Sequence, residues 1–311
     1  MSSGRNSLPT IAVIRGGNVR HGASLEEGVV FLKSLTSLGY EPIDVVIDKE
    51  GNWNHRGIPT DAHAIFTTTD GYVDTTRMHN APHHALAKKM GIMNLFPHAT
   101  ILGEGDRETT YRILRQRGVD VPDTFTIRAS APIDIHFVRE MWGKFHTPLL
   151  VRPIVRKEGL PAKLVRSFKD LFESITAHHE NKTDVHVLTY THTPVFSIAV
   201  LPQYKNESWY TPLPVKVFPE KDEVPHARLT VYHYTKGEAE EKSAIRGTAV
   251  DVVQALDLKS PVCIDIIKSK KGYVVVNVDT NPSLREDGRF MQSLATTGTD
   301  IGHYVQSRLF L

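Results

Sequence analysis

Short apolar runs alternate with helical repeats at the start of this chain. The run at residues 11–14 leads into Gly16-Gly17, leucine and valine residues recur at helical spacing over 25–35, and a second apolar run follows at 43–48. This order predicts a strand, a glycine turn, a helix and a second strand. Such a unit is typical of a doubly wound α/β sheet.

Local signals predict where further elements begin and end. Ser24 and Glu27 have the spacing of a capping box, which predicts that the first helix starts at Ser24. The segment 203–231 is rich in Pro, Lys and Glu, so we expect a long loop there with one strand at 214–218. The pattern also predicts a helix at 107–116, a strand at 124–127 and a helix at 238–256.

Two β-branched runs near the end of the chain, 261–267 and 273–279, are joined by a polar turn and predict a hairpin. Side chains alternate along a strand, so Asn277 and Asp279 face the same side, and pairing can bring Asp265 beside them. These oxygen ligands suit Mg²⁺. The alternative is that they are ordinary polar residues at strand ends.

Composition indicates a globular protein with more than one domain. The chain has 311 residues, of which 40% are hydrophobic, so it can bury a large core. A net charge of +2, without interleaved aromatic and basic residues, gives no indication of a nucleic-acid partner. No apolar segment resembles a signal peptide or a membrane span, and one cysteine fits a reducing cytoplasm, so we expect a cytoplasmic protein with no membrane partner.

Six segments, taken in order, resemble motifs of the D-alanine–D-alanine ligase family, whose fold is the α/β ATP-grasp. They are Gly16-Gly17 with Ala23-Ser24-Leu25, and residues 48–53, 150–153, 194–201, 279–284 and 293–298. The resemblance implies three α/β domains at 1–100, 101–183 and 184–311, the first of them Rossmann-like, with Cys263 on a central strand. It also implies an ATP- and Mg²⁺-dependent ligase that joins a carboxylate to an amine, makes D-alanyl-D-alanine for peptidoglycan, and forms a homodimer.

The resemblance also places the site residues. It assigns phosphate binding to Arg152, Gly159 and Lys163, and metal binding to Asp265, Asn277 and Asp279. It assigns the substrate pocket to Gly16, Gly17, Ser293 and Leu294, and it puts Arg20 and Cys263 at two positions that are catalytic in the family.

Several of these positions depart from the family pattern. Leu188 and Val195 stand where family glutamates hold adenine and ribose, and a valine cannot accept a hydrogen bond from a ribose hydroxyl. Arg152 replaces a lysine, Cys263 replaces the arginine that steadies the tetrahedral intermediate, and Arg20 replaces a glutamate.

These departures favour a catalytically impaired relative, a pseudoenzyme that binds a small molecule or a partner protein and needs no cofactor. The alternative is an active ligase that uses ATP and Mg²⁺.

Overall fold

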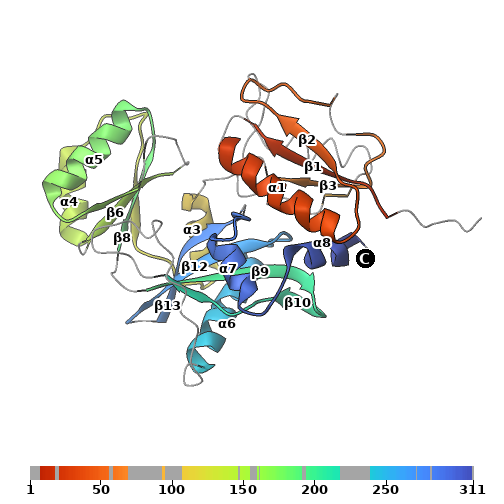
Figure 1. Ribbon diagram of the computed structural model, residues 1–311. Coiled ribbons are helices and arrows are strands. Elements are labelled where there is room, and N and C mark those ends of the chain that lie inside the picture. Colours follow the sequence, from red (N-terminus) through yellow and green to blue (C-terminus); the bar gives the residue numbers. More distant parts are fainter. Residues whose placement is uncertain are drawn as a thin grey trace, which may run out of the picture.

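The computed structural model describes residues 8–17, 21–55, 59–68, 93–94, 107–145, 148–154, 160, 162–190, 194–217, 239–270, 272–280 and 282–309. Within them the chain forms three β-sheets, each with helices packed against it (Figure 1). The predicted α/β class is confirmed, and the sheets follow one another along the sequence.

The first sheet is parallel and has the strand order β2-β1-β3-β4. Its elements are β1 (Ile11–Gly16), α1 (His21–Ser37), β2 (Ile43–Ile47), β3 (Ala64–Thr67) and β4 (Met93–Asn94). The first four residues of β1 are fully buried, as expected for a central strand covered on both faces. The predicted strand, glycine turn, helix and strand are confirmed.

The capping-box prediction for α1 is wrong. The helix begins at His21, three residues before Ser24, and both Ser24 and Glu27 are buried. The Ser24 hydroxyl accepts a hydrogen bond from the Gly16 amide at 2.9 Å. Ser24 faces inward and fixes the helix to the end of β1, whereas Glu27 faces inward toward the Ser283 hydroxyl. Local spacing does not reveal either contact.

The second sheet is antiparallel, with the order β5-β8-β6-β7. Its elements are β5 (Thr124–Ile127), α4 (Ile135–Lys144), β6 (Leu149–Pro153), β7 (Lys163–Val165), α5 (Phe168–Glu180) and β8 (Val185–Thr189). Asp134 caps α4 and Ser167 caps α5 through their side-chain oxygens. Alternate strand residues such as Val151 and Val187 form one core with the two helices.

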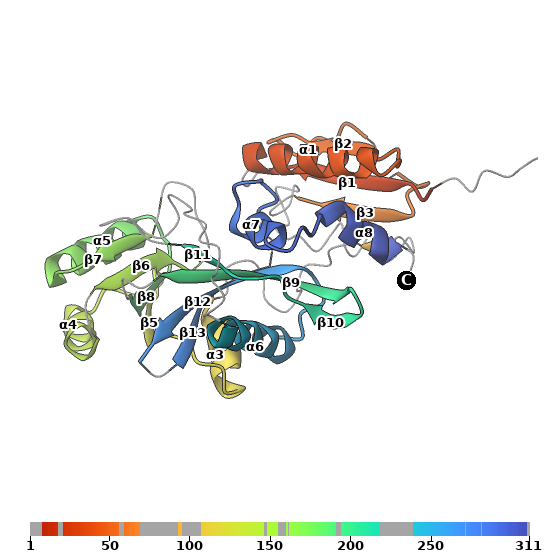
Figure 2. The ribbon, with the colours of Figure 1, turned by 60° about the horizontal axis from the view of Figure 1, so that its bottom comes forward.

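The third sheet is also antiparallel, with the order β10-β9-β12-β13 and β11 paired to β9. Its strands are β9 (Val195–Tyr204), β10 (Glu207–Tyr210), β11 (Val215–Val217), β12 (Val262–Ser269) and β13 (Gly272–Asp279). Helices α3 (Arg107–Gln116) and α6 (Ala239–Ala255) lie on one face of this sheet (Figure 2). The predicted late hairpin is β12 and β13, and Cys263 lies on β12 between two neighbouring strands, as expected.

The prediction of a loop from residue 203 is wrong at its beginning. β9 and β10 form a hairpin whose turn is Lys205-Asn206. Both turn residues have positive φ, 49° and 63°, which matches the twist of a two-residue hairpin. The strand predicted at 214–218 is confirmed as β11, and residues 218–231 lie outside the described part of the chain.

The C-terminal helices connect the third sheet to the first. Helix α7 (Arg289–Ala295) packs on β9, and α8 (Ile301–Leu309) packs on α1 (Figures 1 and 2). Leu294 and Tyr304 share one core cluster with Ile11 and Phe31. The predicted domain boundaries near residues 100 and 184 stay predictions. Among the described residues, no helix is both long and apolar enough to cross a bilayer.

Gly302 tests the docking of α8 on α1. A Cβ at this position lies 3.0 Å from Leu38 Cδ1, 3.2 Å from Ser34 Cβ and 2.8 Å from Asp300 Oδ1. We expect Gly302→Ala to lower the free energy of unfolding by about 1–2 kcal/mol, because the helices must separate. The control Gly247→Ala, in open space on α6, should raise it by roughly 0.5–1 kcal/mol. Urea denaturation measures both, and equal effects would contradict the close packing.

Candidate functional site

A row of polar side chains crosses the third sheet. In the strand register, Ser197 on β9 lies opposite Asp265 on β12, which lies opposite Asn277 on β13. Side chains of directly paired residues lie on the same face of a sheet. The Ser197 hydroxyl donates to Asp265 Oδ1 at 2.5 Å, and the Asn277 amide donates to Asp265 Oδ2 at 3.4 Å. The predicted grouping of Asp265 with Asn277 is therefore present.

Arg289, the first residue of α7, reaches this row of side chains from the helix that packs on β9. Its Nη1 donates to Asp265 Oδ2 at 2.8 Å, and both side chains are largely buried. Burial by itself lowers the pKa of Arg289, but the charge and hydrogen bond of Asp265 outweigh it, and the net direction is upward. The guanidinium is therefore a permanent positive charge at this end of the sheet.

Cys263 lies next to this pair, two residues before Asp265 and opposite Asp279. Burial raises the pKa of the Cys263 thiol, Asp265 and Asp279 raise it further, and Arg289 opposes them. The thiol is therefore neutral near pH 7 and brings no charge to the position.

The residues predicted to bind metal do not fit a hard cation as they stand. Both oxygens of Asp265 already accept hydrogen bonds, and one of them accepts from a guanidinium. Mg²⁺ needs near-octahedral oxygen ligands at about 2.1 Å, so a cation on Oδ2 would meet the Arg289 charge. The described part of the chain contains no group of three or more His, Cys, Asp or Glu side chains arranged to hold a metal.

The second sheet faces this region through Arg152. Its Nη2 donates to the Tyr111 hydroxyl at 2.9 Å and to the Val276 carbonyl at 3.4 Å, and Tyr111 also donates to that carbonyl at 2.5 Å. The register of β12 and β13 shifts at Val276, which leaves its carbonyl outside the ladder. The bulge thus provides the acceptor that joins the second and third sheets.

His186 lies beside Arg152 in the strand register of β8 and β6. It is 1% exposed, and its Nδ1 has no hydrogen-bond partner in the described structure. Burial, and then the positive charges of Arg152, Arg107 and Arg115, lower the pKa of His186 to about 3. The imidazole is neutral at physiological pH.

Leu188 and Val195, at the expected adenine and ribose positions, are both buried. Leu188 is 2% exposed near the end of β8, and Val195 is 3% exposed at the start of β9. Val195 packs with Val217 and Ile267 in a small apolar cluster. Neither side chain can accept a hydrogen bond.

The phosphate-binding prediction is described only in part. Gly159 lies outside the described residues, and Lys163 is an exposed residue at the start of the short strand β7, paired with Val151. The side-chain contacts of Arg152 are described, and they are with the Tyr111 hydroxyl and the Val276 carbonyl. The phosphate site therefore stays a prediction.

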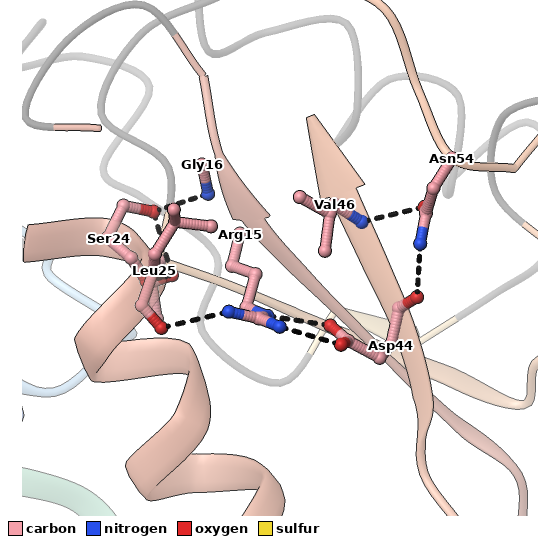
Figure 3. Close-up of polar contacts among 8 residues, drawn as sticks. Arg15, Gly16, Ser24, Leu25, Asp44, Val46 and Asn54 are labelled. Carbon is pink, nitrogen blue, oxygen red and sulfur yellow. Dashed lines mark hydrogen bonds and ion pairs between the residues drawn. The ribbon is translucent and has the colours of Figure 1, made fainter. Parts of the chain in front are cut away.

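The glycine turn after β1 is built for close packing. Gly16 and Gly17 have φ of 95° and 87°, and a Cβ on Gly16 would lie 2.0 Å from the Ile47 carbonyl oxygen. Figure 3 shows Ser24 bonded to Gly16, and Arg15 donating to both carboxylate oxygens of Asp44 at 2.7 Å. Arg20 lies outside the described residues.

Two contacts connect the first sheet's helix to the segment after β13. Ser283 donates to Glu27 Oε1 at 2.6 Å, and Arg285 donates to Glu26 Oε2 at 2.8 Å. Glu27 is buried although its residue type is usually exposed. The carboxylate thus holds the segment that precedes Arg289.

Ser293 and Leu294, predicted for the substrate pocket, are fully buried on α7. The Ser293 hydroxyl accepts from the Ala199 amide at 3.0 Å and donates to the Leu213 carbonyl at 2.9 Å. Its hydrogen bonds therefore join α7 to the backbone of β9 and of the segment before β11. Their role in substrate binding stays a prediction.

Comparisons with known proteins find similarity to D-alanine–D-alanine ligases along nearly the whole chain. A curated D-alanine–D-alanine ligase of Blochmanniella floridana is 22% identical, covering 99% of this chain and 97% of that protein. The chain is similar to a D-alanine–D-alanine ligase over nearly its full length, at low identity. No family model matches it.

Solved structures show the same ATP-grasp fold. The VanG D-Ala:D-Ser ligase of Enterococcus faecalis has a TM-score of 0.76 at 16% identity, covering 98% of this chain and all of that one. The D-alanyl-alanine synthetase A of Vibrio cholerae has a TM-score of 0.78 at 16% identity, with 98% and 99% covered. The Bacillus anthracis ligase complexed with ATP has a TM-score of 0.71 at 15% identity, with 97% and 96% covered.

Sequence reasoning missed Arg289 and Ser197, the two strongest partners of Asp265. Ser197 lies within a segment that resembles a family motif, so its pairing with Asp265 could have been found from the antiparallel register. Arg289 follows a turn and starts a short helix, and no spacing rule connects it with Asp265.

His186 gives a test of pH dependence. The His186 imidazole takes up a proton near pH 6.5 in the unfolded chain but only near pH 3 in the folded protein. The free energy of unfolding therefore falls as the pH falls between these two values, by about 1.4 kcal/mol per pH unit. We expect His186→Gln to flatten the decline in the free energy of unfolding between pH 6.5 and 4. The control His136→Gln, on the exposed face of α4, should keep the parent's slope. Equal slopes in all three proteins, by urea denaturation, would contradict the low pKa.

Proposed function

We propose that this protein is a ligase-derived ATP-grasp protein that does not catalyse ATP-dependent ligation and acts by binding. The observation that carries the proposal is the burial of two aliphatic side chains, Leu188 and Val195, at the positions to which the resemblance assigns adenine and ribose binding. A ribose hydroxyl buried against them would lose its hydrogen bonds to water without gaining new ones, at a cost of about 1–3 kcal/mol each. ATP binding is therefore disfavoured.

The contacts of Arg152 support the same proposal. Arginine keeps the positive charge of the family lysine, but one of its terminal nitrogens is bonded to Tyr111 and to the Val276 carbonyl. A nucleotide phosphate would have to compete with these contacts. The guanidinium joins two sheets, which is a structural role.

Cys263 supports the proposal from the catalytic side. The family arginine at this position supplies fixed positive charge where negative charge develops, and such preorganised charge is often a large part of catalysis. A neutral, buried thiol cannot do this.

One observation favours the alternative, an active ATP- and Mg²⁺-dependent carboxylate–amine ligase. The Arg289 charge acts on the Cys263 thiol, so a guanidinium from α7 lies near the position that the family arginine would occupy. An arginine relocated in this way could restore the lost charge. Turnover assays separate the two functions.

The binding partner belongs to the proposal as well. A ligase scaffold without turnover fits a small-molecule ligand, a true ligase or a second copy of the chain. The single, buried cysteine supports a reducing cytoplasmic setting.

The first test measures ADP release by the intact chain with ATP, Mg²⁺ and D-alanine. We expect no D-alanine-dependent ADP release above background. We also expect no calorimetric signal when ATP is added to about 1 mM, because its dissociation constant should be weaker than that. The Vibrio cholerae synthetase serves as the positive control for the assay. D-alanine-dependent ADP release by this chain would overturn the proposed function and establish the alternative.

A second test restores the family lysine. We expect Arg152→Lys to leave ATP affinity weaker than about 1 mM, because arginine already supplies the charge and the adenine and ribose partners are still missing. Calorimetry compares the variant with the parent chain. A micromolar dissociation constant in either protein would show that the nucleotide site is intact.

A further inference from the structure

The starting point is the burial of Asp265. The residue is 5% exposed on a strand between two neighbours, on the same face as the buried Cys263 side chain. A carboxylate removed from water loses several kcal/mol of solvation unless a cation and hydrogen bonds compensate it. The fold must therefore supply a positive charge at this point.

Arg289 supplies that charge from α7. Its Nη1 lies 2.8 Å from Asp265 Oδ2, and the two side chains are 15% and 8% exposed. Ser197 holds the other carboxylate oxygen. Gly288, directly before Arg289, leaves little room for a side chain, since a Cβ there would lie 3.0 Å from the Ser283 and Arg285 carbonyl oxygens. This tight turn fixes where α7 begins, and with it the position of the guanidinium.

We propose that Arg289 is a built-in cation that takes the place of Mg²⁺ on Asp265. The guanidinium bonds the carboxylate oxygen that an ion would use, and it carries a like charge to any ion that approaches. The protein thus folds with its buried carboxylate neutralised by its own chain, in the absence of metal. The inference rests on the proposed function, because a working ligase of this family uses the ion.

A double-mutant cycle without metal tests the pair. In EDTA, Asp265→Asn leaves Arg289 buried without its carboxylate, so we expect its melting temperature to fall by at least about 6 °C. Arg289→Met should lower it by a similar amount, Arg289→Lys by less, and the double variant Asp265→Asn/Arg289→Met should recover part of the loss. If the carboxylates instead form a metal site, removing one relieves repulsion, and Asp265→Asn is as stable as the parent chain in EDTA. That result would overturn the proposal.

The matched control is the exposed pair of Arg285 and Asp287, which lies a few residues before Arg289. Its closest N–O distance is 3.1 Å, similar to the buried pair, but its side chains are 50% and 73% exposed. We expect Asp287→Asn to shift the melting temperature by less than about 2 °C. A shift as large as that of Asp265→Asn would show that burial of the pair is not what matters, and would overturn the proposal.

Titration with Mg²⁺ alone, without nucleotide, completes the experiment. We expect the parent chain to melt at the same temperature in EDTA and in 10 mM Mg²⁺, an excess that should reveal a millimolar site. A stabilisation by Mg²⁺ that Asp265→Asn abolishes would overturn the proposal, and this measurement needs no Arg289 variant to fold. Stabilisation by Mg²⁺ without ADP release would overturn this inference alone. ADP release by a chain that free Mg²⁺ does not stabilise, and in which the double-mutant cycle still couples Asp265 with Arg289, would overturn the proposed function alone.

Discussion

The register of β9, β12 and β13 is the constraint on which the rest of the site depends. Because antiparallel pairing sets residues directly opposite one another, it aligns Ser197, Asp265 and Asn277 in one row. The same hairpin carries a bulge one residue beyond this row, which frees the Val276 carbonyl to bind Tyr111 and Arg152. One pattern of strand pairing therefore fixes both the polar row and the contact with the second sheet.

The two faces of the third sheet have different roles. Ile264 and Ile266 face α6 and form a dry core, whereas Cys263 and Asp265 face α7 and the N-terminal sheet. On the second face Arg289 of α7 pairs with the Asp265 carboxylate, and Glu27 holds the segment that leads into α7. The helix that carries the ion pair therefore follows directly on a segment bonded to the helix of the N-terminal sheet.

Elements with strong local signals could be predicted from sequence, and contacts between distant elements could not. The hairpin of β12 and β13, the helix α3 and the strand β5 follow from apolar period and turn residues, which act within a few residues. The capping box at Ser24 failed because a serine at that spacing can equally bond the Gly16 amide. The family resemblance predicted the ATP-grasp fold and pointed to Asp265. No motif marks Arg289, because the two partners of a salt bridge are close in space but need not be close in sequence.

An acidic residue at position 265 is therefore weak evidence for catalysis. In an active ligase the carboxylate is retained to hold the ion. In this chain the same carboxylate is engaged by Ser197, Asn277 and Arg289, and losing it would leave a buried guanidinium unpaired. On our proposal, the presence of Arg289 makes folding alone a reason to keep the carboxylate, whatever happens to the nucleotide site. The positions that discriminate are those where folding and catalysis make opposite demands. Leu188 and Val195 are buried in the core, and at the positions to which the resemblance assigns adenine and ribose binding their side chains cannot accept a hydrogen bond.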